Sequence, residues 1–180
     1  MPLDTETFRR VMSAFPTGVT VVTTVGEDDQ PKGLTLQAFV AVSSEPPLLL
    51  ISLDRESRTL DAMMARGAFV VNFLAAGREH VSNKFASKDE DKFADVNWRP
   101  SKIARGAPVL ADDSVAYAEC IVSEKIAAGD HWLFVASVEG GDSNDRTPLL
   151  YFRRQYSAWS SEHAVLAPQA RDDWPSYTDW

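Results

Sequence analysis

The sequence predicts a mainly β protein, a closed or nearly closed antiparallel barrel with small helical insertions. Short runs rich in β-branched and aromatic residues recur along the chain. Turn-forming Gly, Pro and Asp residues separate these runs. The runs do not alternate regularly with helical segments of about 10–15 residues, which argues against a doubly wound parallel sheet.

The first third of the chain predicts one helix and three strands. Asp4 is placed to cap a helix whose apolar residues recur at helical spacing, and Pro16 and Gly18 end it. Strands are predicted over residues 19–25, 34–42 and 48–53, and a charged turn over 26–33 follows the first. Because proline cannot donate to a central ladder, the pair Pro46–Pro47 marks the break before the third strand.

The rest of the chain predicts two further helices and four strands. Helical spacing starts at Ser57 and stops at Gly67. A strand over 68–74 and a helix over 78–85 follow, with a further helical turn over 88–95 and an irregular stretch over 97–107. The later strands cover residues 114–126, 131–139 and 148–152, and residues 156–159 are interpreted as a continuation of the last one.

Length and composition predict one intracellular domain. The chain has 180 residues, within the range of about 100–200 for a single domain. Residues 1–163 carry the barrel pattern and residues 164–180 form a tail. Trp174 and Trp180 in this tail could dock on the barrel or on a second subunit, and a fraying terminus is the alternative.

Charge and apolar patterning restrict the partners. The net charge of −8 argues against nucleic-acid binding, which normally requires a basic excess. The N-terminus has no apolar signal core, and no apolar run approaches the roughly 20 residues that span a bilayer. A cytoplasmic protein without a membrane partner is therefore expected. The single cysteine, Cys120, excludes a disulfide within the chain and is interpreted as a packing residue of a strand.

Several common kinds of catalytic site are absent from the sequence. Neither a G-x-G-x-x-G nor a G-x-x-x-x-G-K-[ST] loop is present, and no G-x-S-x-G elbow indicates a serine hydrolase. His80, His131 and His163 are widely separated, and one cysteine cannot form a thiolate cluster, so no metal site is expected.

The turn from Asp54 to Thr59 could bind a phosphate group. It lies between a predicted strand and a predicted helix, where main-chain N–H groups are unpaired. Ser57 and Thr59 add hydroxyl donors, and Arg55 and Arg58 add positive charge. The alternative is that Ser57 is only a helix cap and that the arginines are solvated.

Three other segments could contact a ligand. Residues 35–38 are polar or small within an apolar strand, and solvent exposure is the alternative. Ser82, Lys84 and Phe85 end a short helix, where a lysine could reach a phosphate or simply lie at the surface. His131 follows Gly129 and Asp130 at the mouth of a strand, and its imidazole could donate a hydrogen bond or a proton, unless it is only an exposed hairpin residue.

The order of these segments resembles the flavin reductase-like family, the FMN-binding split barrels, and within it the small reductase component of two-component flavin-dependent monooxygenases. The resemblance covers about residues 8–159. The matching segments are Phe15-Pro16-Thr17-Gly18-Val19, Gly33-Leu34-Thr35, Val42-Ser43, Pro46-Pro47-Leu48, Ser57-Arg58-Thr59, Phe69-Val70-Val71-Asn72, Ser82 to Ala86, Lys92-Phe93, Gly129-Asp130-His131, Leu150-Tyr151-Phe152 and Tyr156.

The resemblance implies a six-stranded antiparallel Greek-key split barrel that forms a homodimer, with flavin near the subunit interface. It places Thr35, Leu36, Gln37 and Ala38 along the isoalloxazine, and Ser52, Leu53 and Asp54 at the ring or ribityl chain. Ser57, Arg58 and Thr59 would take the phosphate, Ser82, Lys84 and Phe85 the distal part of the flavin, and Tyr156 a place near the rings. His131, the catalytic candidate, would lie beside the nicotinamide. Leu36 departs from the family, where small residues are common.

The expected activity is NAD(P)H-dependent reduction of FMN or FAD by hydride transfer, with NADH or NADPH as donor and a partner monooxygenase as recipient of reduced flavin. Because the two cofactors carry this chemistry, the absence of a catalytic triad is no objection. The alternatives are a non-enzymatic flavin-binding or electron-carrier protein, a flavin-dependent oxygenase with its own substrate, and a barrel that binds no flavin.

Overall fold

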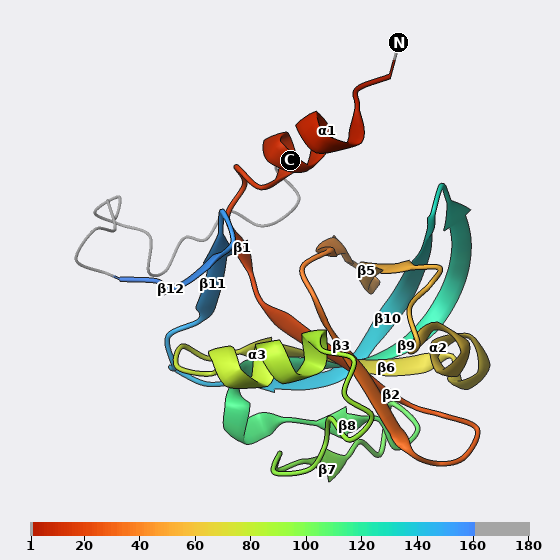
Figure 1. The fold of residues 1–180 in the computed structure, drawn as a ribbon. Coiled ribbons are helices and arrows are strands. Elements are labelled where there is room, and N and C mark those ends of the chain that lie inside the picture. The colour runs from red at the N-terminus through yellow and green to blue at the C-terminus, as the bar shows by residue number, and fades with distance from the viewer. Residues whose placement is uncertain (1, 161–180) are drawn as a thin grey trace.

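The computed structural model describes residues 2–160, and the predictions for Trp174 and Trp180 lie outside them. Figure 1 shows the arrangement of the elements. The helices are α1 (Thr5–Met12), α2 (Leu60–Arg66) and α3 (Glu79–Ala86), with a 3₁₀ turn η1 (Ala111–Asp113). The strands are β1 (Thr17–Gly18), β2 (Thr20–Val25), β3 (Pro31–Leu36), β4 (Phe39–Ser44), β5 (Pro47–Asp54), β6 (Ala68–Leu74), β7 (Arg99–Pro100), β8 (Pro108–Val109), β9 (Ser114–Ala128), β10 (His131–Ser143), β11 (Leu149–Phe152) and β12 (Gln155–Ala158). Within residues 2–160, no helix is long and apolar enough to cross a membrane.

The predicted antiparallel barrel is confirmed, with seven strands in its main sheet where six were expected. Their order is β3-β2-β6-β9-β10-β5-β4, and every pair is antiparallel. The two edge strands, β3 and β4, follow one another in the chain with only Gln37 and Ala38 between them. The sheet must therefore curl until its edges approach each other.

The single strand predicted over residues 34–42 is wrong, because the chain changes direction at Gln37 and Ala38. The N–H of Phe39 donates to the carbonyl of Gln37 at 2.9 Å, a tight turn that ends β3. The hydrophobic alternation continues through this turn, so the sequence pattern alone did not reveal it. The break at Pro46–Pro47 is confirmed, and β4 and β5 pair across it.

The largest core cluster lies on the inner face of the barrel, and β2 and β6 are buried on both faces. On β5, Leu49, Ile51 and Leu53 are buried and alternate with half-buried Leu50 and Ser52. In β10, Phe134 lies opposite Ile51 and is fully buried. Directly paired residues share a face of a sheet, so Ser52 and its partner Leu133 lie on the outer face. Burial of the inner face supplies the main driving force for folding.

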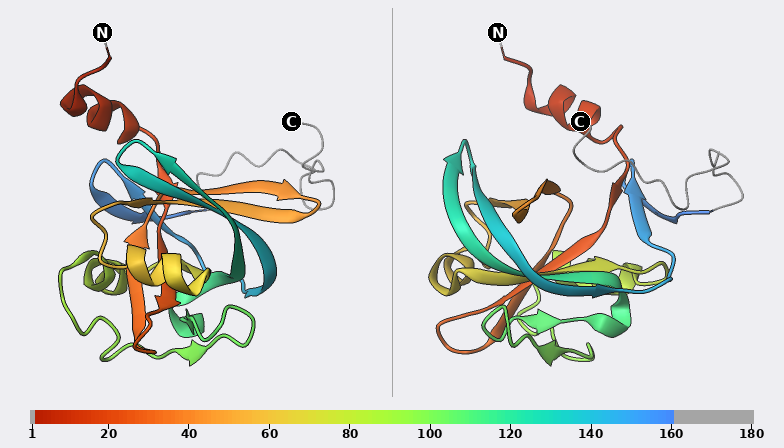
Figure 2. Two further views of the ribbon diagram at one scale, coloured as in Figure 1. Left: turned by 90° about the vertical axis from the view of Figure 1, so that its right-hand side faces the viewer. Right: turned by 180° about the vertical axis from the view of Figure 1, so that it is seen from behind.

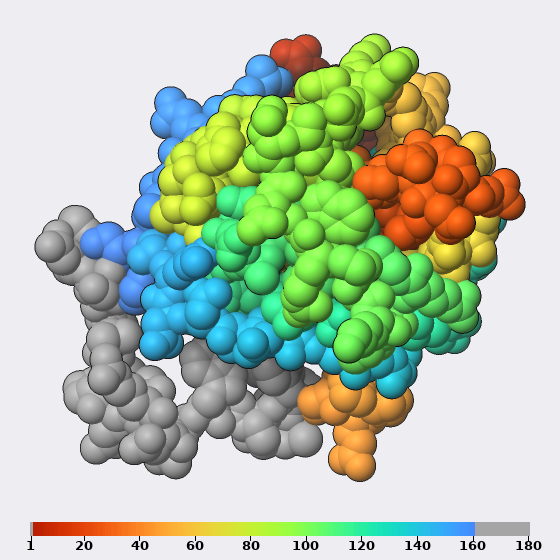
Figure 3. Space-filling view, turned by 90° about the horizontal axis from the view of Figure 1, so that it is seen from below, coloured from red at the N-terminus to blue at the C-terminus, as the bar shows by residue number. Residues whose placement is uncertain are grey.

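Residues 97–113 cover the face of β6 that points away from the barrel interior, on the side of the molecule that Figure 3 shows from below. Ala104, Ala107 and Val109 pack against β6. The buried Asn72 holds this segment in place: its amide donates to the carbonyl of Val21 at 3.1 Å, and its Oδ1 accepts from the N–H of Leu110 at 2.8 Å. An apolar side chain at position 72 would leave these buried main-chain groups without hydrogen-bond partners.

The predicted helices form where expected, with one exception. Asp4 caps α1 by accepting from the N–H of Thr7 at 2.9 Å, and Gly67 ends α2 in the left-handed conformation, with φ of 61°. Residues 88–95 form turns instead of the predicted helical turn. The carboxylate of Asp91 accepts the N–H of Ala94 there, and such local bonds compete with a helix.

α1 and the β11–β12 hairpin stand apart from the barrel proper, on the side where β1 leaves it (Figure 2). β1 pairs with β11, and β11 pairs with β12, so that a three-stranded sheet forms beside the main one. The prediction that residues 156–159 continue the strand before them is wrong, because the chain reverses at Arg153 and Arg154 and β12 runs back along β11.

Candidate functional site

A cavity of about 410 Å³, named the main cavity because most predicted site residues line it, lies between the β3–β4 junction, the ends of β5 and β10, α3 and the β11–β12 hairpin. This volume is within the range of about 300–1,000 Å³ that is typical of small-molecule sites. Its lining combines polar groups with aliphatic and aromatic ones: Val19, Leu34, Thr35, Leu36, Gln37, Ala38, Ser52, Asp54, Ser57, Ser82, Ala86, His131, Tyr151 and Tyr156.

The β3–β4 junction forms one wall of the main cavity. The hydroxyl of Thr35 donates to the carbonyl of Ser82 at 2.5 Å, which ties β3 to α3. The carbonyl of Leu36 accepts from the hydroxyl of Thr20 at 2.6 Å. Gln37 and Ala38 are exposed, so the Gln37 amide and nearby main-chain groups are accessible to a ligand. This wall can form hydrogen bonds with the polar edge of a flat heterocycle.

Another wall of the main cavity is aromatic. Tyr151 and Tyr156 are paired across the β11–β12 hairpin, with ring centroids 5.1 Å apart. The Tyr156 hydroxyl lies 3.0 Å from Ser82 Oγ and 2.9 Å from Asn83 Oδ1, which fixes the ring against α3. Fixed aromatic faces are suited to stacking on a planar ligand.

His131 and Asp54 lie directly opposite each other at the ends of β10 and β5, next to the pair Leu133–Ser52. The Nδ1 atom of His131 lies 2.7 Å from Asp130 Oδ1. The pKa of Asp130 is lowered below its ordinary value. The largest cause is the hydrogen bond with His131, followed by main-chain hydrogen bonding and the charge of the imidazole. Asp130 thus fixes the orientation of the imidazole, and the Nε2 atom has no hydrogen bond to residues 2–160.

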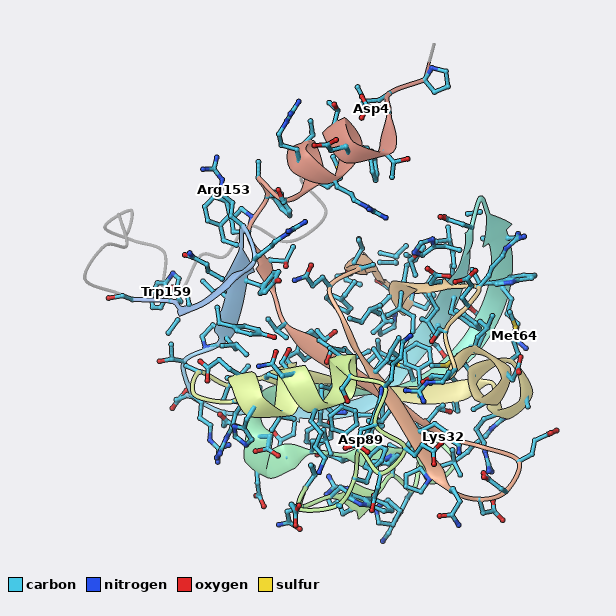
Figure 4. All side chains as sticks on the ribbon, in the orientation of Figure 1. Asp4, Lys32, Met64, Asp89, Arg153 and Trp159 are labelled. Atoms are coloured by element: carbon cyan, nitrogen blue, oxygen red, sulfur yellow. The ribbon has the colours of Figure 1, made fainter. Side chains whose placement is uncertain are left out.

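A second cavity, about 330 Å³, is lined by Gly33 and Thr59 and by five charged residues: the cations Lys32, Arg58 and Lys92 and the carboxylates Asp89 and Glu90. Lys32 and Asp89, labelled in Figure 4, belong to its lining, together with Arg58 and Lys92. Lys92 donates to the carbonyls of Phe85 at 2.7 Å and Gly33 at 3.3 Å. Burial first, and then the positive charge of Arg58, lower the pKa of Lys92. Two cations held this close together favour an anionic ligand.

Most predicted site residues line one of these two cavities. Ten line the main cavity: Thr35, Leu36, Gln37, Ala38, Ser52, Asp54, Ser57, Ser82, His131 and Tyr156. Arg58 and Thr59 line the second cavity. Thr59 is buried, and its hydroxyl donates to the carbonyl of Gly33 at 3.4 Å, while its N–H donates to Ser57 Oγ at 3.3 Å. The roles of all these residues in binding remain predictions.

Three predicted site residues have side chains that line neither cavity. Leu53 and Phe85 are fully buried in the core. Phe85 packs against Gly33, where an added Cβ would lie 2.8 Å from the Phe85 ring. Lys84 points toward residues 94–95 instead, donating to the carbonyl of Ala94 and lying 3.9 Å from Asp95 Oδ2. The sequence placed these residues on the correct segments but could not tell which face of each segment they occupy.

Other lining residues were not predicted. In the main cavity these are Val19, Leu34, Ala86 and Tyr151, and in the second cavity they include Lys32. Lys92, from the Lys92-Phe93 segment of the family resemblance, also lines the second cavity. Tyr151 could have been found from Tyr156, because a two-residue turn at Arg153 and Arg154 places them opposite each other. Lys32 and Lys92 are 60 positions apart in the sequence and meet only in the fold. Within residues 2–160, no group of three or more His, Cys, Asp or Glu side chains could hold a metal ion.

Comparison with known proteins gives one consistent result. The family model for the flavin reductase like domain matches residues 12–160. The chain is 46% identical to "Flavin reductase (NADH)" of Kitasatospora aureofaciens over 162 residues, covering 89% of this chain and 84% of the relative. It is 40% identical to the reductase subunit HsaB of a flavin-dependent monooxygenase from Mycobacterium tuberculosis, covering 95% and 90%.

A solved structure agrees with these matches. Nitrilotriacetate monooxygenase component B from Mycobacterium thermoresistibile superposes with a TM-score of 0.85 at 39% sequence identity, covering 96% of this chain and 95% of that one.

Proposed function

Because the chain belongs to the flavin reductase-like family, we propose that it catalyses NAD(P)H-dependent reduction of FMN or FAD and supplies the reduced flavin to a partner monooxygenase. The observation that carries this proposal is the pairing of the two cavities. The main cavity combines a polar wall with an aromatic one, and the second cavity, which Thr59 also lines, presents the cations Arg58 and Lys92 beside the carboxylates Asp89 and Glu90. A planar ring with a phosphate-bearing chain has this distribution of groups.

In the proposed complex, residues 35–38 bind the polar edge of the isoalloxazine, and Tyr156 lies near the rings. Ser52 and Asp54 face the ring or the ribityl chain. Ser57 lines the main cavity while Arg58 and Thr59 line the second, so this short turn connects the two. The phosphate then lies beside Ser57 and Arg58, within reach of Lys92. Guanidinium and ammonium groups form the stronger, charge-assisted hydrogen bonds with such an anion.

The bound cofactors supply the redox chemistry: a hydride passes from the nicotinamide to the flavin, giving oxidised nicotinamide and reduced flavin. The chain holds the two rings in contact and orients them. His131, oriented by Asp130, donates a hydrogen bond or a proton beside the nicotinamide. Donors on residues 35–38 stabilise the negative charge that reduction places on the ring.

A homodimer is part of the proposal, and the outer face of the sheet supports it. Val40 pairs with Leu50 and Leu50 with Val135, so these three share the face opposite the core. Val40 is 56% exposed, and Ile126, which pairs with Leu133 on this face, is 43% exposed. Ser52, Asp54 and His131 lie on the same face at its end. A second subunit covering the apolar strip would therefore border the main cavity.

A matched pair of variants tests the dimer. Val40→Asp places a charge in the apolar strip and should yield monomers in sedimentation analysis at micromolar concentration, with weakened flavin binding. Glu139→Asp, at an exposed position of β10 that already carries a carboxylate, should leave the mass unchanged. A monomeric wild-type protein would rule out the dimer.

The partner monooxygenase follows from the kind of relative that the chain resembles, since HsaB is itself a reductase subunit of such an enzyme. Free reduced flavin is the product that passes between the two proteins. A cytoplasmic location, where NAD(P)H is available, is part of the same proposal.

The decisive experiment follows NADH and NADPH absorbance in the presence of FMN, FAD or riboflavin. Multiple turnovers of free flavin are expected, at a rate that depends on flavin concentration. The rival function, a flavin-binding electron carrier, would give no steady-state consumption of NADH or NADPH with any flavin, and that result would reject the proposed activity.

A further inference from the structure

A separate hollow of about 770 Å³ lies between α1 and the turn of the β11–β12 hairpin, and arginine side chains collect in it. Its lining residues are Thr5, Glu6, Arg9, Arg10, Ser13 and Arg154. Figure 4 shows Arg153, the neighbour of Arg154, at the end of this hairpin next to α1.

The three guanidinium groups of the hollow lack carboxylate partners within residues 2–160. Ion pairs elsewhere in this part of the chain use Lys32, Arg66, Arg78, Lys84 and His131. Among the described residues, Arg10 donates only to the hydroxyl of Thr7, at 3.5 Å. One carboxylate, Glu6, lines the hollow without pairing with any of the arginines. In a chain with a net charge of −8, three unneutralised arginines around one hollow form a local site for an anion.

The backbone of the hairpin turn adds an independent observation. Arg153 and Arg154 have φ angles of 47° and 65°, the left-handed pair that a two-residue hairpin turn requires. Asn and Gly are the residues that favour these positions, and other side chains cost about 1 kcal/mol or more each. Arg153 lies over the Phe152 ring at 5.1 Å, and Arg154 lines the hollow. Arginine thus occupies a position that the turn alone would give to glycine, which indicates a role for the charge.

The same hairpin connects the hollow to the main cavity. Tyr151 and Tyr156 line the main cavity and lie two positions from the turn. At about 3.3 Å per residue, the turn is about 7 Å farther along the hairpin. A substrate whose reactive ring lies in the main cavity can therefore extend along the hairpin to the arginines.

We propose that Arg9, Arg10 and Arg154 bind the phosphate groups of the nicotinamide dinucleotide while its nicotinamide ring occupies the main cavity. The inference rests on the proposed function, which makes NAD(P)H a substrate of that cavity. Guanidinium groups bind phosphate oxygens through paired, charge-assisted hydrogen bonds, and the hydroxyls of Thr5 and Ser13 add further donors.

The kinetic test compares hydride donors with and without phosphate groups. In the variant R9Q/R10Q/R154Q of the full chain, at saturating FMN, the KM for NADH and NADPH should rise about 10-fold or more, as expected for losing charge-assisted hydrogen bonds. The kcat/KM for reduced nicotinamide riboside, which has no phosphate, should stay unchanged. Lys102→Gln removes an exposed charge elsewhere and should change none of these values.

Two single variants separate charge from turn geometry. Arg154→Gly fits the left-handed φ and should keep or raise Tm, yet the KM for NADH should rise. Arg154→Lys keeps the charge and should change that KM much less. The proposal is overturned if Arg154→Gly and the triple variant both leave the KM for NADH and NADPH unchanged. It is also overturned if these variants lower only the turnover that is coupled to a monooxygenase.

A binding measurement keeps this proposal separate from the proposed activity. Titration calorimetry with ADP-ribose needs no catalysis, and its Kd should be about 10-fold weaker or worse in the triple variant. Equal ADP-ribose affinity in wild type and variant contradicts the arginine site. Failure of every hydride donor, the riboside included, to reduce flavin in the wild type contradicts the proposed function instead.

Discussion

The hydroxyl of Tyr156 lies 3.0 Å from the hydroxyl of Ser82, so the C-terminal hairpin is hydrogen-bonded to α3 across the wall of the main cavity. Ser82 is fully buried, and its carbonyl also accepts from Thr35. One residue of α3 thus connects two walls that are far apart in the sequence, and the shape of the cavity depends on this connection.

Removing the Tyr156 hydroxyl tests this dependence. Tyr156→Phe keeps the ring but loses its hydrogen bonds, and a net loss of about 0.5–1.5 kcal/mol corresponds to a roughly 2- to 10-fold weaker Kd for FMN. Quenching of flavin fluorescence measures it. The control is Tyr151→Phe, the partner ring, whose hydroxyl has no hydrogen bond to residues 2–160. Equal Kd values in the two variants would contradict a positioning role for Tyr156.

Charge in the second cavity should act on phosphorylated flavins alone. Arg58→Gln and Lys92→Gln should each weaken FMN and FAD binding about 10-fold, the loss expected of a charge-assisted hydrogen bond, and should leave riboflavin binding unchanged. Lys88→Gln, at an exposed position nearby, serves as the control. A parallel loss of riboflavin affinity would show that these side chains shape the ring site rather than bind phosphate.

The pair Asp130–His131 predicts both a kinetic and a pH effect. His131→Ala should lower kcat while flavin still binds, and Asp130→Asn should lower kcat by about 2- to 10-fold through loss of one orienting hydrogen bond. Unchanged steady-state kinetics in His131→Ala would remove His131 from the mechanism.

The sign of the pH effect follows from the lowered pKa of Asp130. A carboxyl whose pKa is lowered by folding contributes its interaction above its unfolded pKa and loses it as pH falls through the folded value. The contact with His131 is therefore complete at neutral pH and lost only in acid. Carboxyl NMR titration should show the pKa of Asp130 rising toward its ordinary value in His131→Ala.

Cys120 provides a prediction about stability at high pH. Burial, and then the charge of Glu119, raise the pKa of this thiol to about 12. The native protein should therefore resist a thiol reagent at pH 8 and react only when unfolded. Between pH 9 and 12 the unfolded thiol ionises while the native one does not, so stability should fall with rising pH. Cys120→Ala should remove that part of the slope, and chemical denaturation across this range measures it.

The sequence predicted the parts of the fold that local pattern determines. Pro46–Pro47 and the stop at Gly67 act through their own backbone, the cap at Asp4 acts through its carboxylate on a neighbouring N–H, and each lies where it was expected. The turn at Gln37 and Ala38 was missed because the hydrophobic alternation runs through it unchanged. Tertiary closure of the sheet, rather than local preference, bends the chain there.

For the site, the sequence placed the segments better than the side chains. Ser57, His131 and residues 35–38 meet around one cavity as expected. Leu53 and Phe85 belong to the same segments but face the core, since adjacent strand positions alternate and helix faces depend on packing. Lys32 was not predicted beside Lys92, because nothing in a sequence pattern brings two such distant lysines together.

The junction of β3 and β4 also governs how firmly the molecule holds together. Within residues 2–160 each of these edge strands is hydrogen-bonded to one strand only. The barrel wall therefore has a seam beside the main cavity, where β3 and β4 do not pair with each other. A ligand lying along that seam binds the folded chain and not the unfolded one, adding about 2.7 kcal/mol when its concentration is 100 times Kd. The melting temperature of this barrel should therefore rise with the fraction of protein that has ligand bound. The ligand-free protein is the form most easily unfolded and cleaved by proteases.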